Sequence, residues 1–320
     1  MLSVEDPMRY PKRSRFSAAI ATVIAMTLVL VGCAGISSSA GSDPNNPDQV
    51  EAITWWTSGT EKTALYDMVA VFKQENPSLQ FIDASVSGGG GEKARQAIAA
   101  RLGSNNPPDT FQSGAGAALS DYVAQGKLQD LTSFYAQHGL TDVYRAALLE
   151  QLSVDGKIYS VPSGIHRVNV LWSNNTLLAA AGVDPAVAPL TISAWLDDLE
   201  EVRASGVEYP LALGNDWTQV QLFENVLLAD MGAVLYQNLW KSTKNWEGKA
   251  LRAAIDHYNR LLDYVAPHSG SKEWTEATDS VIEGDAAYVL MADFALAAFQ
   301  RVGLESGGQF SAIPTPGTVG

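Results

Sequence analysis

The sequence has a single cysteine, Cys33, and only four histidines among its 320 residues. One thiol can form neither an intramolecular disulfide nor a thiolate metal cluster. The histidines, at positions 138, 166, 257 and 268, fall in no metal-ligand spacing, and no G-x-S-x-G elbow is present to hold a strained nucleophilic serine. We therefore expect no metal, no cofactor and no catalytic residue, although counting residues leaves a Ser-His-Asp triad open.

Basic residues are scarce as well, because 21 Lys and Arg face 35 Asp and Glu, for a net charge of -14. A surface this acidic repels phosphate backbones and anionic headgroups. The charge therefore argues against nucleic-acid binding and against membrane contact beyond an anchor. It also makes an anionic ligand unfavourable.

Long apolar runs are nearly absent, and the one that stands out covers residues 16–31. It follows four basic residues within 9–15 and is shorter than the roughly 20 residues that span a bilayer. It ends in Leu-Val-Gly-Cys33, which resembles the lipobox of bacterial lipoproteins. This resemblance implies a signal peptide over 1–32, with lipidated Cys33 as the mature N-terminus; an uncleaved anchor is the alternative. Either way, the remaining chain is expected outside the cytoplasm, in the periplasm or on the outer face of the membrane.

Residues 33–49 are small and polar and include prolines, so we expect a flexible tether. Beyond it, segments with strand and helix patterns alternate, which predicts a parallel α/β sheet. A β-rich stretch over 161–172 is interpreted as a crossover strand into a second, more helical part. Strands are expected over 50–56, 79–86, 110–112, 288–291 and 309–313, a hairpin around 154–157, and helices near 62–75, 92–102, 119–125, 144–151, 220–228, 250–265 and 274–283. Ser193 is expected to cap a further helix that buries Trp195 and exposes the acidic residues within 197–201.

Two glycine-rich stretches, 88–93 and 114–119, lack the spacing of phosphate-binding loops. We interpret both as turns that let the backbone pass close to another group. The aromatic residues are more informative, because Trp55 and Trp56 end the first expected strand, Trp217 lies in an expected loop and Trp274 begins a helix. Indole faces with nearby carboxylates and amides suit a sugar, although core packing is the alternative for any single tryptophan.

Five segments in order resemble the extracellular solute-binding proteins (family 1) of carbohydrate ABC importers. They are ITWW (53–56), VFKQENP (71–77), PPDTFQ (107–112), YSVPSGIHRVNVLW (159–172) and PLALGNDWTQ (210–219). The last segment resembles the glucose- and galactose-binding branch in particular. The likeness covers residues 50 to 320.

The resemblance implies an α/β fold, the two-lobe periplasmic-binding-protein clamshell (type II), lacking its C-terminal portion. Lobe 1 would cover 50–162, and a helix-rich α/β lobe 2 would cover 163–309. Residues 310–320 would begin a return crossover whose remainder is absent. The protein would be a monomeric, non-enzymatic lipoprotein that captures a glucose- or galactose-like mono- or disaccharide between its lobes and delivers it to the permease subunits of an ABC transporter.

The resemblance also implies the sugar contacts. These would be Trp55, Trp56, Glu61 and Gln112 in the first lobe, His166 near the crossover, and Trp217, Trp274, Asp293 and Phe294 in the second lobe. Two positions depart from glucose binders: Gly114 replaces a histidine and Phe294 replaces a tryptophan. A lost hydrogen bond and a smaller stacking face favour another mono- or disaccharide. A membrane-anchored glycoside hydrolase with two catalytic carboxylates and an anchored adhesion module remain as alternatives.

Overall fold

The structure is a computed structural model that describes residues 46–104 and 106–318. The expected signal peptide, the lipidation site Cys33 and most of the expected tether lie outside the described residues. Those three interpretations therefore stay predictions. Within the described part of the chain, every helix is too short or too polar to span a bilayer.

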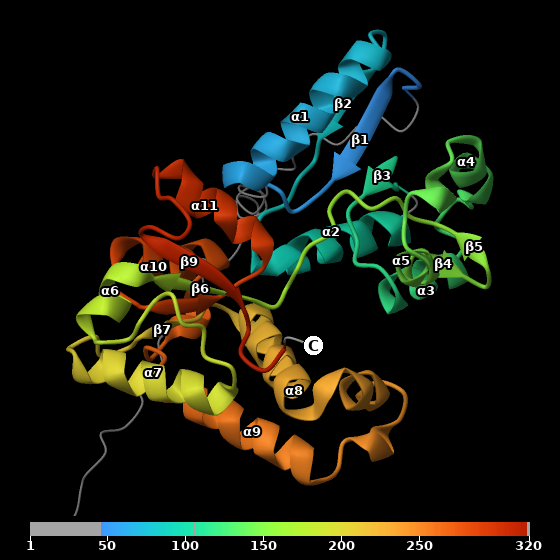
Figure 1. The fold of residues 1–320 in the computed structure, drawn as a ribbon. Helices are drawn as coiled ribbons and strands as arrows, with labels where there is room; N and C mark the ends of the chain where they lie inside the picture. Colours follow the sequence, from blue (N-terminus) through green and yellow to red (C-terminus); the bar gives the residue numbers. More distant parts are fainter. Residues whose placement is uncertain (1–45, 105, 319–320) are drawn as a thin grey trace, which may run out of the picture. The chain divides into compact units, whose positions relative to one another are not determined.

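A three-stranded parallel sheet with the order β2-β1-β3 organises the first lobe (Figure 1). Its elements are β1 (Gln49–Ile53), α1 (Gly59–Glu75), β2 (Gln80–Asp83), α2 (Glu92–Gly103), β3 (Thr110–Phe111) and α3 (Ala117–Ala124). This alternation is the predicted α/β arrangement. The first strand ends earlier than predicted, because the Trp55 amide donates to the Gln112 side chain and the Trp56 amide to Thr54 Oγ1 instead of to a neighbouring strand.

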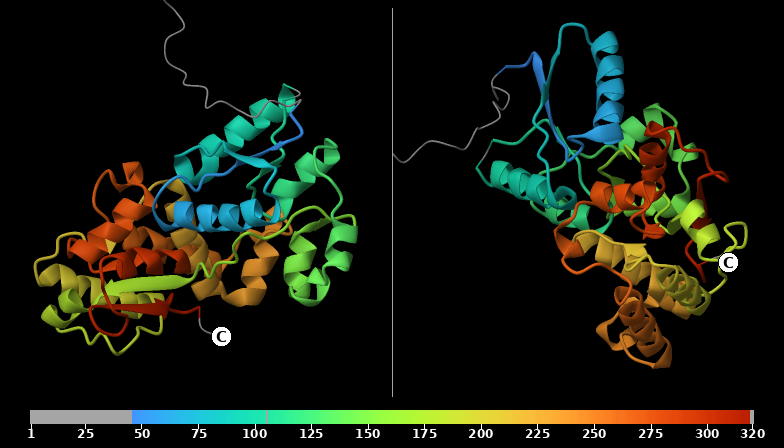
Figure 2. Two further views of the ribbon diagram at one scale, coloured as in Figure 1. Left: turned by 90° about the horizontal axis from the view of Figure 1, so that it is seen from above. Right: turned by 90° about the vertical axis from the view of Figure 1, so that its left-hand side faces the viewer.

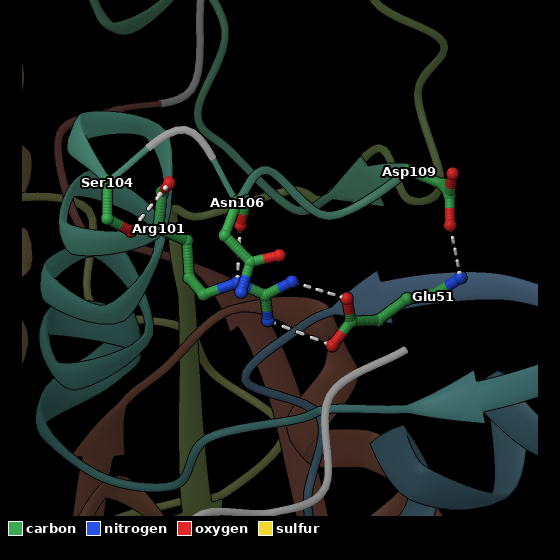
Figure 3. Close-up of polar contacts among 5 residues, drawn as sticks. All are labelled: Glu51, Arg101, Ser104, Asn106 and Asp109. Carbon is green, nitrogen blue, oxygen red and sulfur yellow. Dashed lines mark hydrogen bonds and ion pairs between the residues drawn. The ribbon is translucent and has the colours of Figure 1, made fainter. Parts of the chain in front are cut away.

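A buried ion pair fastens α2 to the centre of this sheet (Figure 3). The side chain of Glu51 on β1 is fully buried, and its two carboxylate oxygens accept hydrogen bonds of 2.9 and 2.6 Å from Arg101. The Arg101 Nε group donates to the Asn106 carbonyl, and Asp109 accepts the backbone N–H of Glu51. These contacts connect α2 to β1 and to Asn106, and β1 to Asp109, just before β3.

The remainder of the first lobe consists of short elements around a small core that includes Tyr135 and Leu152. These elements are α4 (Thr132–Gln137), α5 (Ala146–Gln151), β4 (Ser153–Val154) and β5 (Lys157–Ile158). The last two strands form the predicted hairpin, with an antiparallel pairing. Its turn residues Asp155 and Gly156 both have positive φ, at 51° and 76°, as tight two-residue hairpins require.

The connection between the lobes has little regular structure (Figure 2). The predicted strand over 161–172 was too long, since only β6 (Val170–Asn174) pairs with other strands. Strand structure needs a neighbouring ladder, and the preceding segment contains Pro162 and exposes Ile165 and Val168. The expected lobe boundary at 162/163 falls inside this segment.

A four-stranded mixed sheet with the order β7-β8-β6-β9 organises the second lobe. Strands β7 and β8 are parallel, whereas β6 is antiparallel to both β8 and β9. The elements are α6 (Asn175–Ala180), α7 (Ile192–Ala204), β7 (Leu211–Ala212), α8 (Asp216–Leu239), α9 (Lys249–Leu262), α10 (Trp274–Glu283), β8 (Tyr288–Leu290), α11 (Leu296–Arg301) and β9 (Phe310–Pro314). Two apolar clusters fill this lobe.

Two local expectations about α7 were wrong. Thr191, not Ser193, caps the helix, because its Oγ1 accepts the Ala194 N–H at 3.1 Å. The acidic residues within 197–201 do not all lie on a solvated face: Asp198 is half-buried and accepts a hydrogen bond from the buried Tyr288 hydroxyl at 3.2 Å. Burial raises the pKa of Asp198.

The start of α8 also differs from the prediction. The helix begins at Asp216, so Trp217 lies in its first turn and not in a loop. It continues to Leu239 with a break at Gly232, whose φ of 74° and ψ of 162° are not helical. Gly232 therefore divides α8 into two helical segments.

Candidate functional site

A cavity of about 930 Å³ is lined by side chains from both lobes. Eight of the nine predicted sugar contacts lie on its wall: Trp55, Trp56, Glu61, Gln112, His166, Trp217, Trp274 and Phe294. Its volume is at the upper end of the range of small-molecule sites, about 300–1,000 Å³. The cavity also extends over apolar side chains of α1 and the first sheet, among them Leu65, Val69, Phe72 and Phe81.

On the first lobe, backbone contacts beyond the end of β1 hold the adjacent tryptophans Trp55 and Trp56. Gln112, just after β3, accepts the Trp55 N–H through Oε1 at 3.2 Å. Thr54 Oγ1 accepts the Trp56 N–H at 2.9 Å and lies 3.1 Å from the Ser85 hydroxyl. Each indole is half-buried, so both keep part of their surface open to the cavity.

Glu61 enters the cavity from the first turn of α1. Burial raises its pKa from 4.5 to about 7, and the nearby His166 opposes part of that rise. Near neutral pH this carboxyl group therefore exists in both protonation states. The protonated group can donate as well as accept a hydrogen bond, which suits the hydroxyl groups of an uncharged ligand.

On the second lobe, three aromatic rings form a continuous surface on the cavity wall. Phe294 meets Trp274 at a centroid distance of 4.9 Å and His166 at 5.2 Å, both edge to face. Trp274 begins α10, where Glu273 and Glu276 form a capping box. This cap fixes the start of the helix at Trp274.

Asp293 is the one predicted contact that does not line the cavity. Its carboxylate lies 2.9 Å from His166 Nδ1 and accepts the Arg167 N–H at 3.0 Å. The geometry therefore makes Asp293 an anchor for the segment that carries His166. Direct contact between Asp293 and a sugar stays a prediction.

The sequence analysis missed Glu273, which lines the cavity between the two helices that carry Trp217 and Trp274. Its Oε2 atom accepts a hydrogen bond of 3.1 Å from Asn215 Nδ2. The spacing of Glu273 and Glu276 at the start of a predicted helix is a capping signal that could have placed Glu273 beside Trp274. Gly114 also lines the cavity, and a Cβ added there would meet only Ala118 Cβ at 3.8 Å.

Two other tryptophans pack in the core, as the alternative interpretation of a single tryptophan predicts. Trp195 is fully buried in the second lobe, and Trp172 stacks on Phe299 with a centroid distance of 5.1 Å. Neither lines the cavity. Tertiary position, not residue type, therefore separates the cavity tryptophans from the core tryptophans.

A Ser-His-Asp arrangement does occur, on α7, α8 and α9. Ser193 Oγ lies 3.2 Å from His257 Nε2, and His257 Nδ1 lies 2.8 Å from Asp230 Oδ2. None of the three residues lines the large cavity. Among residues 46–104 and 106–318, no group of three His, Cys, Asp or Glu side chains is placed to hold a metal ion.

Known proteins share both the sequence and the fold of this chain. A probable sugar-binding periplasmic protein of Mesorhizobium japonicum is 31% identical over 296 residues, which are 91% of this chain and 69% of that protein. The glucose-binding protein GlcS of Saccharolobus solfataricus is 28% identical over 73% of this chain and 44% of its own length. Among solved structures, a chitin oligosaccharide binding protein superposes with a TM-score of 0.70 at 22% identity, over 85% of this chain and 68% of that chain.

At 22% identity this superposition is evidence for the fold and not for the ligand. The chain has the two-lobe fold that the sequence predicts. Residues 56–320 match the family described as bacterial extracellular solute-binding protein. This match covers most of the chain, and the Mesorhizobium relative agrees with it. The chain therefore belongs to the bacterial extracellular solute-binding proteins.

Proposed function

We propose that this protein is the substrate-binding component of an ABC sugar importer and captures a mono- or disaccharide between its lobes. The observation that carries the proposal is the meeting of aromatic and polar side chains from both lobes on one cavity wall. Trp55 and Trp56 come from the first lobe, and Trp217 and Trp274 come from the second. A ligand in contact with both sides would favour the closed arrangement over the open one.

The chemistry of the wall supports an uncharged polyhydroxylated ligand. Indole rings cover the CH faces of a sugar ring, while carboxylate, amide and imidazole groups satisfy its hydroxyl groups. Glu61, Gln112 and Glu273 supply such groups here. The relatives support the same ligand class, since one is a glucose-binding protein and another a probable sugar-binding periplasmic protein.

The role of the protein in transport follows from the ligand class and the family. We infer that the sugar leaves the cavity unchanged and passes to the permease subunits of an ABC transporter. The proposal also includes a lipid anchor on Cys33 and a position outside the cytoplasm. It further includes a monomeric state and a lobe boundary near residue 162. The open space beside Gly114 on the wall supports a ligand other than glucose.

Isothermal titration calorimetry with D-glucose, D-galactose, D-xylose and maltose tests this function. We expect binding of at least one sugar, and Trp55→Ala and Trp274→Ala should each weaken it on the order of tenfold, since a lost aromatic contact and its buried area exceed about 1 kcal/mol. Trp240→Ala is the control, because Trp240 is 55% exposed and does not line the cavity.

Two results would contradict the proposal. Unchanged affinity in both Trp55→Ala and Trp274→Ala would show that the sugar does not bind at this cavity wall. Release of free sugar from p-nitrophenyl glycosides, lost on Glu61→Gln or Glu273→Gln, would favour the glycoside hydrolase alternative.

A further inference from the structure

The glycine turn, Gly88–Gly91, lies between β2 and α2 and lines the cavity through Gly88, Gly90 and Gly91. Its backbone is left-handed at Gly90, with φ of 55° and ψ of 36°, and at Gly91, with φ of 90° and ψ of 0°. Non-glycine residues adopt such values at a cost. Backbone conformation alone, however, does not explain why both positions also lack space for a side chain.

Two indoles from different lobes lie against adjacent glycines of this turn. A Cβ added to Gly90 would be 2.4 Å from Cδ1 and 2.6 Å from Nε1 of Trp217, which belongs to the second lobe. A Cβ added to Gly91 would be 2.8 Å from Cδ2 and Cε3 of Trp55, which belongs to the first lobe. Real Cβ atoms do not approach other heavy atoms this closely. The glycine turn is therefore the surface on which both tryptophans rest.

Both sides of the contact between Gly90 and Trp217 are held in place. On the first lobe, Arg95 Nη1 donates to the Gly90 carbonyl at 3.4 Å, and Arg101 fastens α2 to Glu51. On the second lobe, Thr218 Oγ1 accepts the Gly214 N–H at 3.0 Å and donates to the Asn215 carbonyl at 2.9 Å. Trp217 also packs against the apolar cluster of that lobe. A methyl group at position 90 would therefore push the glycine turn and the Trp217 ring apart.

We propose that Gly90 is a positioning residue for lobe closure. Trp217 packs against Gly90 when the lobes meet, and any residue with a Cβ at position 90 would clash with the indole. This inference rests on the proposed function, in which closure accompanies sugar binding. Trp217 then has two roles, as part of the cavity wall and as the second-lobe half of an interlobe contact. The apparent dissociation constant rises as the fraction of molecules able to close falls. A tenfold loss of the closed state thus gives about tenfold weaker binding.

The test compares Gly90→Ala with Gly139→Ala. Gly139 has a similar left-handed φ of 64° and ψ of 21°, but a Cβ there meets nothing within 4 Å. Both substitutions therefore introduce a comparable backbone cost in the first lobe, and only Gly90→Ala introduces the contact with Trp217. Calorimetry should show about tenfold weaker binding of the preferred sugar for Gly90→Ala and less than a twofold change for Gly139→Ala.

Hydrogen–deuterium exchange without sugar gives a readout that does not depend on the ligand. Gly90→Ala should accelerate amide exchange in residues 215–219 of the second lobe at least threefold, while Gly139→Ala leaves it unchanged. The effect should vanish when Gly90→Ala is added to Trp217→Ala, because the clashing ring is then gone. If Gly90→Ala fails to fold, Trp217→Leu breaks the same contact with the turn intact and should accelerate exchange in residues 88–94 of the first lobe.

The outcomes separate the two proposals. Absence of any sugar binding by the unmodified protein would contradict the proposed function, and the exchange experiment would still decide the role of Gly90. Equal exchange in Gly90→Ala and Gly139→Ala would overturn the interlobe contact, as would an undiminished effect of Gly90→Ala in the Trp217→Ala background.

Discussion

The carboxylate of Glu51 and the guanidinium of Arg101 form a two-point ion pair inside the first lobe, with N–O distances of 2.9 and 2.6 Å (Figure 3). The Glu51 side chain is completely buried, and that of Arg101 is 20% exposed. Hydrogen bonding to Glu51 raises the pKa of Arg101. The pair joins the central strand β1 to α2, and α2 begins at the glycine turn on the cavity wall.

Replacing Arg101 by methionine should lower the free energy of unfolding by about 3 kcal/mol, because it leaves a buried carboxylate without its cation. Urea denaturation measures this loss. Arg301→Met is the control, since the Arg301 side chain is 60% exposed and pairs with Asp279 at the surface. That substitution should cost less than about 0.5 kcal/mol. Equal losses in the two variants would contradict a structural role for the buried pair.

Asp293→Ala should weaken sugar binding about fivefold and lower the free energy of unfolding by about 1 kcal/mol, since the side chain is 46% exposed. The substitution removes the acceptor for the Arg167 N–H and the partner of His166, and hydrogen bonds of this kind contribute about 1 kcal/mol. His166 would then be free to leave the cavity wall. Calorimetry together with thermal unfolding separates the two effects. Wild-type affinity in Asp293→Ala would show that the His166 position is set by other contacts.

The raised pKa of Glu61 predicts that the free energy of unfolding falls as the pH rises. Its pKa is about 7 in the folded chain and 4.5 as the ordinary value, so the folded state binds the proton more tightly. This contribution to stability is complete below about pH 4.5, declines as the pH rises, and is gone above about pH 7. Because the group is partly exposed, we expect a change of roughly 1–2 kcal/mol, less than the full conversion of the shift.

Urea denaturation of the wild-type protein and Glu61→Gln at pH 4.5, 6 and 8 checks this expectation. The difference in stability between the two proteins should change in favour of Glu61→Gln as the pH rises. A constant difference across the three pH values would show that the Glu61 carboxyl group is not held protonated by burial.

His257→Ala should destabilise the second lobe by about 1–2 kcal/mol and leave sugar affinity unchanged. The ring joins Ser193 on α7 to Asp230 on α8, so its loss removes two hydrogen bonds between helices. Denaturation and calorimetry measure the two quantities. Hydrolysis of p-nitrophenyl acetate that Ser193→Ala abolishes would instead identify these residues as an active site.

Local patterns in the sequence predicted α10 to the residue and a hairpin around 154–157, because apolar periodicity and turn residues act over a few neighbouring positions. The same logic failed where tertiary contacts decide. The end of β1 depends on the side chain of Gln112, which is distant in sequence. The strand predicted over 161–172 forms a ladder with other strands only from Val170 onward. Ser193 and Thr191 both satisfy the sequence preference for a helix cap, and only the backbone geometry selects Thr191.

The sequence was enough to predict the fold, through an ordered set of family segments, and to suggest the proposed ligand class, through tryptophans next to strand ends and helix starts and a shortage of basic residues. Which side chains share the cavity became visible only in the folded structure. In the folded chain, Glu273 lines the cavity, Asp293 binds His166 without lining the cavity, and Trp217 packs against Gly90. The physical reason is that periodicity and capping act over one or two turns of backbone, whereas contacts between residues more than a hundred positions apart depend on how two separately packed cores meet.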